Sequence, residues 1–228
     1  AASDYSEDLR LDHSILEQHA ESYRKIRNTF RFILGNLRDQ KINFDLNSKE
    51  IEKWPELERF ILHQIFILNK KFEKYFKEYN FHKLYKELLN FCSLDLSAFY
   101  FDIRKDALYC DEIRAPKRKA CINLLGLTLD ILLKWFAPIL SFTTEEIFQI
   151  LNKEKNTSIH LESFPEVPSK WENIKLFQKW NELKKIRNVA NAAIEIKRSN
   201  KDIGSSLEAE VQIYLSEEYL KLVKDVDL

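Results

Sequence analysis

The sequence predicts a mainly α-helical protein, a helical bundle followed by a small C-terminal junction of helix and strand. Composition is the first reason, because the 228 residues include only three glycines and five prolines while Leu, Ile, Lys, Glu and Phe are abundant. Periodicity is the second reason. Most apolar residues recur at helical spacing, and strict alternation is confined to one short stretch near the C-terminus.

The first predicted helix runs from Asp12 to Leu37. Asp12 is a suitable N-cap, and Gly35 followed by Asn36 marks the expected end. At about 100° per residue, one side of this helix collects mostly apolar side chains. They are Ile15, His19, Tyr23, Ile26, Phe30, Ile33 and Leu37. This side is expected to face the core.

The opposite side of the same helix combines cations with an aromatic residue. Its members are Arg24, Asn28, Arg31, Phe32 and Gly35. Guanidinium groups neutralise phosphates, an aromatic ring can stack on an unpaired base, and a glycine permits close approach. The alternative is that Phe32 packs against a second neighbour in the bundle. The pattern by itself leaves both interpretations open.

Two further helices follow a polar loop at residues 38–53. Trp54-Pro55 is expected to begin the first of them, with proline at the first helical position. The second is predicted over Phe81–Tyr109, interrupted by a re-capping point near Ser93. Arg104 and its charged neighbours are expected on the outer side of this helix.

Two more helices complete the predicted bundle, which covers roughly residues 12–152. Lys117–Leu140 is almost entirely apolar and should end or kink at Pro138. Ser141–Leu151 begins with a capping pattern. The cations in the first turn of the apolar helix, Arg118 among them, are either simply solvated or matched by an anion.

The last part of the chain changes in character. Residues 153–170 are polar and contain prolines, which predicts a connecting segment on the surface. Residues 171–201 return to helical spacing, with Arg187 in the polar part. Residues 207–215 alternate strictly and predict a strand, and a short helix near residues 217–224 should follow it.

Charge and hydropathy exclude two classes of function. The chain carries 36 basic and 36 acidic residues, and its formal net charge is zero. This balance argues against a protein that coats nucleic acid through charge alone, although a local basic face remains compatible with it. No apolar run reaches the roughly 18 residues needed to span a bilayer, so we expect no membrane partner.

Cysteine usage and motifs give no indication of a metal or an active site. Cys92, Cys110 and Cys121 lack C-x-x-C spacing, so neither zinc nor a disulfide framework is expected and reducing cytosol is the default. The sequence has no Gly-rich phosphate loop, H-E-x-x-H motif or nucleophile elbow, and no catalytic residue is predicted. Because the sequence contains no methionine, we expect an excised piece of a longer protein.

Four stretches resemble the anticodon-binding region of bacterial isoleucyl-tRNA synthetases, which belong to class I. They read RKIRNTFRFILGNL at 24–37, FCSLDLSAFYFDIRKDALY at 91–109, APILSFTTEEI at 137–147 and IGSSLEA at 203–209. The third stretch is shared more loosely with valyl, leucyl and methionyl relatives. The likeness covers essentially the whole chain, and the opening residues are similar to the exit from that family's catalytic domain.

This resemblance implies a parent enzyme that attaches isoleucine to its tRNA with ATP and Mg, and with zinc in members that end in a cysteine-rich module. The parent is expected to be monomeric and cytoplasmic. The chain itself should catalyse neither step and hold no cofactor, because the family's His-x-Gly-His and Lys-Met-Ser-Lys-Ser signatures and its editing domain are missing. These parts are expected N-terminal to Ala1. The implied domains are the catalytic-domain exit (1–11), the anticodon-binding bundle (12–152), the connecting segment (153–170) and the junction region (171–228).

The resemblance also implies a binding site. An Arg-Phe step in the family's first bundle helix lies near the anticodon loop, and Arg31 and Phe32 match it. Arg24, Asn28, Arg118 and Arg187 are further candidates for contact with isoleucine tRNA. The rival hypothesis is a structural or protein-partner-binding helical module with no RNA role, which the neutral net charge keeps open.

Overall fold

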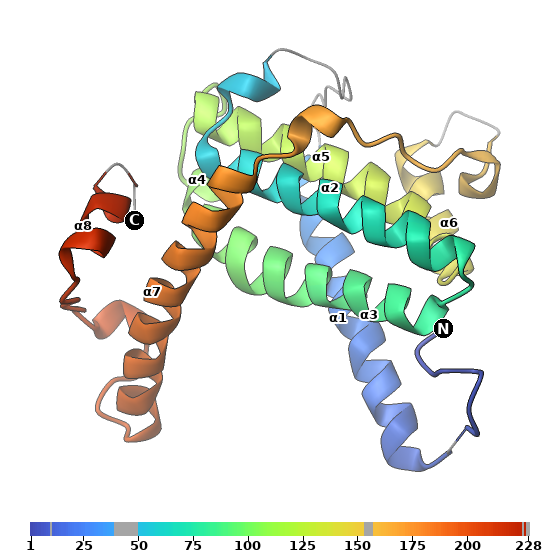
Figure 1. The fold of residues 1–228 in the computed structure, drawn as a ribbon, viewed down its shortest axis with the longest axis horizontal. Coiled ribbons are helices and arrows are strands. Elements are labelled where there is room, and N and C mark those ends of the chain that lie inside the picture. Colours follow the sequence, from blue (N-terminus) through green and yellow to red (C-terminus); the bar gives the residue numbers. More distant parts are fainter. Residues whose placement is uncertain (10, 39–49, 153–156, 225, 227–228) are drawn as a thin grey trace. The chain divides into compact units, whose positions relative to one another are not determined.

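A computed structural model of the chain describes residues 1–9, 11–38, 50–152, 157–224 and 226. These residues form helices and connecting segments, and no strand occurs among them (Figure 1). They divide into two compact units, residues 1–172 and 173–228. The prediction of a mainly α-helical protein is confirmed, and none of the helices described is both long and apolar enough to cross a membrane.

The first helix, α1, covers His13–Leu37. Its predicted N-cap is confirmed, because the Asp12 carboxylate accepts a hydrogen bond from the backbone N–H of His13 at 2.6 Å. The C-terminal half of the predicted core side is buried, namely Ile26, Phe30, Ile33 and Leu37. The N-terminal half of that side is only partly buried, so only the later turns of α1 pack in the core of the bundle.

The first unit contains five further α-helices among the described residues. They are α2 (Glu56–Lys77), α3 (Phe81–Asn90), α4 (Asp102–Tyr109), α5 (Pro116–Phe136) and α6 (Ser141–Leu151). Short 3-10 turns lie at Ile51–Lys53, Ile159–Leu161 and Ser169–Trp171. The apolar helix α5 packs against α1, α2, α4 and α6, and is buried over most of its length. Most of the predicted loop at 38–53, and residues 153–156 of the predicted connecting segment, lie outside the described residues.

Between α3 and α4 the chain stays helical. Phe91–Phe101 forms a π-helix that joins the two α-helices end to end, so the predicted re-capping near Ser93 is wrong. The wider turn of a π-helix explains the difference, because side chains four or five residues apart then share a face. Phe91, Leu96 and Tyr100 follow that spacing, and all three are buried.

A buried polar cluster connects four elements of the first unit. The Glu58 carboxylate of α2 has no exposed surface and accepts two hydrogen bonds from Arg104 of α4, at 2.7 and 2.9 Å. Tyr100 of the π-helix donates to the same carboxylate at 3.1 Å, and Cys121 of α5 donates at 3.3 Å. The expectation that Arg104 lies on the outer side is therefore wrong, because a buried carboxylate partner draws its side chain inward.

The second unit contains two helices, α7 (Ile174–Ser199) and α8 (Glu217–Val223), with a 3-10 turn at Ser206–Glu208. The Tyr219 hydroxyl on α8 donates a hydrogen bond to the Glu182 carboxylate on α7 at 3.0 Å. The predicted strand at residues 207–215 is not formed. Alternation makes a segment suitable for a sheet, but a strand also needs a hydrogen-bonded neighbour, and none pairs with it among the described residues.

The buried ion pair gives a stability prediction. Arg104→Ala should lower the free energy of unfolding by about 3–5 kcal/mol, because it leaves the Glu58 carboxylate buried without its cation. Lys105→Ala is the matched control, since Lys105 pairs with Asp102 at 3.3 Å on the surface and should cost less than about 1 kcal/mol. Urea unfolding of both variants measures the difference. Equal losses would contradict a stabilising role for the buried pair.

Candidate nucleic-acid interface

The outward side of α1 carries a row of five exposed residues. They are Arg24, Asn28, Arg31, Gly35 and Arg38, and we call this row the α1 strip. Their spacing alternates between four and three residues, which keeps them within about 40° of one direction around the helix. At 1.5 Å of rise per residue, the strip is about 21 Å long. It lies opposite the buried side of the helix.

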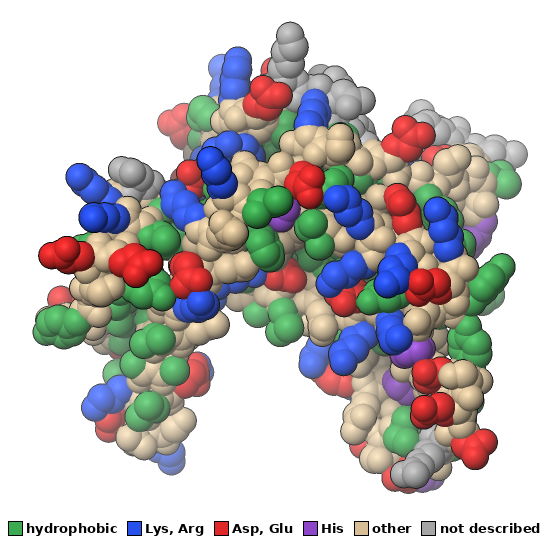
Figure 2. Space-filling view, viewed as in Figure 1, with side chains coloured by type: hydrophobic (Ala, Val, Ile, Leu, Met, Phe, Trp, Pro, Cys, Tyr) green, Lys and Arg blue, Asp and Glu red, His purple; other side chains and the backbone are tan. Residues whose placement is uncertain are grey.

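The α1 strip lies in a stretch of uniform charge. Residues 22–38 contain five cations and no acidic residue, namely Arg24, Lys25, Arg27, Arg31 and Arg38. By contrast, Figure 2 shows that Lys and Arg are mixed with Asp and Glu on the surface of α2 and α3. A positive surface within a neutral chain is therefore a local feature of α1, and such a surface attracts a polyanion at short range.

The cations of this stretch differ in how firmly they are engaged. Arg24 pairs with Glu21 at 3.2 Å, and both side chains are more than half exposed. No hydrogen bond or ion pair joins Arg31 to any other residue that the structure describes. Because an exposed ion pair is weak, both guanidinium groups can turn to a phosphate at little cost.

Phe32 lies on one flank of the strip, about 80° from its centre by helical geometry. Its ring is half-buried and stacks on Phe101 of the π-helix, with ring centroids 4.2 Å apart and planes inclined by 15°. Phe32 therefore packs against a second neighbour, which is the alternative that the sequence left open. Any base stacked on this residue would have to use the side of the ring that Phe101 leaves uncovered.

The other flank of the strip is held by α6. The hydroxyl groups of Tyr23 and Thr143 are hydrogen-bonded at 2.9 Å, and Arg27 donates to the Tyr23 oxygen at 3.0 Å. These two hydrogen bonds, Thr143 first, lower the pKa of Tyr23. Arg27 also lies 3.8 Å from Glu146, so one cation of the stretch is partly neutralised on this side.

The last two predicted candidates are not part of the strip. Arg118 lies in the first turn of α5 and donates to the backbone carbonyl of Asp111 at 2.6 Å, which ties down the loop before the helix. Arg187 is a half-buried residue of α7 and belongs to the second unit. The structure thus brings together Arg24, Asn28 and Arg31 from the predicted set. The predicted set does not include Lys25, Arg27 and Arg38, the other cations of this stretch, although counting charges along residues 22–38 would have found them.

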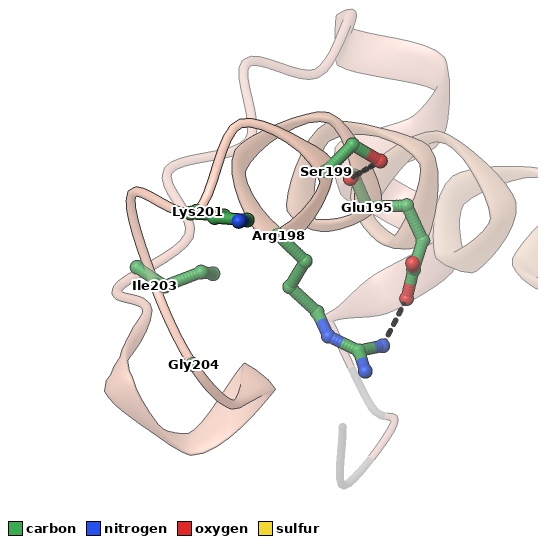
Figure 3. A pocket seen from close by; sticks show the side chains of 6 residues that line it. All are labelled: Glu195, Arg198, Ser199, Lys201, Ile203 and Gly204. Carbon is green, nitrogen blue, oxygen red and sulfur yellow. Dashed lines mark hydrogen bonds and ion pairs between the residues drawn. The ribbon is translucent and has the colours of Figure 1, made fainter.

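The second unit has a shallow hollow of about 450 Å³ beside the end of α7 (Figure 3). Its lining residues are Glu195, Arg198, Ser199, Lys201, Ile203 and Gly204. Arg198 is ion-paired with Glu195 at 2.5 Å within this lining. The backbone N–H of Gly204 donates to the Glu208 carboxylate at 2.9 Å. Because the lining carries charges of both signs and Arg198 is already ion-paired, the hollow does not favour a ligand of either charge.

The described residues contain no group of His, Cys, Asp and Glu that could hold a metal ion. Two of the three cysteines, Cys92 and Cys121, are buried. Burial raises the pKa of both thiols, that of Cys121 to about 12. At neutral pH these two side chains are therefore neutral thiols, which are poor nucleophiles and poor metal ligands.

Comparison with known proteins places the fold in a family. Residues 58–213 match the family described as the anticodon-binding domain of tRNA ligase. The whole chain is 59% identical over 227 residues to an isoleucine–tRNA ligase of Pelagibacter ubique, and covers 25% of that protein. The corresponding protein of Mesorhizobium japonicum is 40% identical over 99% of the chain, with 22% of its own length covered. The chain thus spans about a quarter of the length of these curated relatives.

Packing on the two sides of α1 predicts unequal costs for removing its phenylalanines. Phe30 is 1% exposed, so Phe30→Ala should lower the free energy of unfolding by about 3–5 kcal/mol. Phe32→Ala should cost less, about 1–2 kcal/mol, because the ring is half-buried and loses mainly its stack on Phe101. Thermal or urea unfolding measures both.

A double-mutant cycle between Phe32 and Phe101 isolates the stack itself. The expected coupling is about 0.5–1.5 kcal/mol. If the two alanine substitutions were simply additive, the stack would contribute nothing to stability and would not fix the position of Phe32.

Proposed function

Because this chain belongs to the anticodon-binding domain family of tRNA ligases, we propose that its α1 strip holds the anticodon stem and loop of a tRNA. The observation that carries the proposal is that residues 22–38 contain no acidic residue, and that three of their five cations, Arg24, Arg31 and Arg38, lie on one exposed side of α1. Cations on one exposed side of a helix neutralise phosphates and fix the register of a nucleic acid. The strip supplies that chemistry on a rigid element.

The tRNA is that for isoleucine, and the longer protein attaches isoleucine to it with ATP and Mg. Support comes from the relatives, each of which is an isoleucine–tRNA ligase that this chain matches over nearly its whole length. We extend the proposal to a monomeric, cytoplasmic parent whose catalytic steps take place outside this chain.

The residues of the site have different roles in this proposal. Arg31 neutralises a phosphate, and Arg24 exchanges its ion pair with Glu21 for a second one. Asn28 lies between them and offers an amide to a base edge or a ribose. Phe32 contributes the uncovered side of its ring. Arg118 holds the loop before α5 in place and has an indirect role. Arg187, on α7 of the second unit, is a separate candidate for a tRNA contact.

The rival function, a structural or partner-binding helical module, has less support. Its only support in the sequence is the neutral net charge of the chain. Charge on α1 is segregated rather than mixed, and the family match is to a domain that binds RNA by description.

Salt dependence tests the proposed function. Binding of isoleucine tRNA should give a log–log salt slope of roughly −2 to −5, as expected for a handful of phosphate contacts. Arg31→Ala should weaken binding roughly fivefold or more and make the slope shallower by about one. Lys74→Ala removes an exposed charge from α2 and is the control. A slope near zero, or equal effects of the two variants, would count against the proposed site.

The chain on its own should not catalyse isoleucine-dependent exchange of pyrophosphate with ATP. Its matched region is an anticodon-binding domain, and its sequence carries neither nucleotide-binding signature of the synthetases. Radiolabelled pyrophosphate exchange, with the longer enzyme as positive control, measures this directly. Exchange by a preparation free of the longer enzyme would contradict the proposal that the catalytic steps take place outside this chain.

A further inference from the structure

We propose that Gly35 is itself a contact point, where the ribose–phosphate backbone of the bound RNA lies directly against the backbone of α1. This inference rests on the proposed function and deepens it. It assigns a role to the one member of the α1 strip that has no side chain.

The fold does not require a glycine at this position. A Cβ atom added to Gly35 would meet no atom of the described residues within 4 Å. None of the described glycines has a positive φ, so an L-residue could adopt the same backbone conformation. Among the described residues, neither packing nor backbone geometry therefore accounts for the glycine.

Glycine as a helix terminator does not account for it either. Terminating glycines occupy the position after the C-cap, where the chain turns left-handed. In α1 the helix continues through Gly35 to Leu37, and Arg38 is the C-cap. Gly35 is thus an interior residue of the last turn, where glycine reduces the folded-to-unfolded ratio by a factor of roughly two to five relative to alanine.

Its position along the strip indicates what the bare backbone is for. Gly35 follows Arg31 by four residues and precedes Arg38 by three, so these cations lie about 6 Å and 4.5 Å from it along the helix axis. A strand whose phosphates are held by guanidinium groups on both sides must pass over the residue between them. Without a side chain at that point, the strand can lie against the helix surface.

Two sets of contacts on the flanks of α1 leave its strip uncovered. The stack of Phe32 on Phe101 occupies one side, and the contacts of Arg27 with Tyr23 and Glu146 occupy the other. The strip between these contacts is open to an RNA strand, and Gly35 is the position between Arg31 and Arg38 where no side chain stands between the strand and the helix backbone.

Gly35→Ala in the full 228-residue chain should raise the stability of the protein and lower its affinity for tRNA. The melting temperature should rise by roughly 1–4 °C, because alanine favours the helix. Affinity for transcribed isoleucine tRNA should fall about tenfold, because the methyl group occupies the space of the strand. A rise in melting temperature with unchanged affinity would overturn the inference.

Gly35→Lys separates contact from charge. If the strip acts by charge alone, an added cation in its middle must tighten binding. If the strand lies against Gly35, the lysine must weaken binding despite its charge. Gln18→Lys is the matched control, because it adds the same charge to an exposed position of α1 about 120° away from the strip. Its affinity should stay within about twofold of the parent chain.

Arg31→Ala in the same assay distinguishes failure of the inference from failure of the proposed function. If Arg31→Ala weakens binding while both Gly35 variants bind as tightly as the parent, the inference is wrong and the proposed function stands. If Arg31→Ala and both Gly35 variants leave affinity unchanged, the strip is not the RNA site and both are wrong. Weaker binding by all three supports both.

Discussion

Glu58 accepts four hydrogen bonds in the interior of the first unit, from Arg104, Tyr100 and Cys121. Its carboxylate has no contact with solvent, so the desolvation cost is offset only while these partners remain in place. The cluster ties α2, the π-helix, α4 and α5 to one point. Hydrophobic contacts tolerate small rotations of a helix, but directional hydrogen bonds to a buried charge do not. The rotation of each of these elements about its own axis is therefore restricted by Glu58.

The orientation of the candidate site follows from this restriction. With Tyr100 and Arg104 turned toward Glu58, Phe101 is directed to α1, where its ring stacks on Phe32. A second tie lies close by, because the Thr29 hydroxyl is hydrogen-bonded to the Cys92 carbonyl at 3.3 Å and to the Ser97 hydroxyl at 3.1 Å. Both contacts join α1 to the π-helix and set the angle at which α1 presents its outer side. A buried electrostatic cluster thus contributes to which residues of α1 lie on its exposed side.

Local sequence determined most helix limits and could predict them. The Asp12 cap and the limits Ser141–Leu151 depend on neighbouring residues, and both are confirmed. The capping pattern predicted at the start of Ser141–Leu151 is wrong, because Leu140 is the N-cap and the Ser141 hydroxyl donates to the Ala137 carbonyl instead. The features that were missed depend on distant partners. Arg104 is buried because of a carboxylate 46 positions away, and residues 207–215 remain without the neighbour that a strand needs. The helical wheel placed Phe32 within a quarter turn of the strip. It could not predict that Phe101 covers one side of the Phe32 ring, because Phe101 is distant in sequence.

The neutral net charge of the chain gives the strip its particular character. Cations and anions are equal in number overall, so their fields largely cancel beyond a Debye length of about 8–10 Å. At the proposed site, an RNA approaching from farther away would be steered only weakly, and most of the attraction would arise once phosphates are near the α1 strip. At that distance the shape of the surface matters as much as its charge, because a phosphate held a few ångströms too far out loses its hydrogen bonds. A neutral protein that binds a polyanion through one row of cations therefore depends on how closely the strand can approach that row. This is the physical reason for the contact that we propose at Gly35, the one position without a side chain between Arg31 and Arg38.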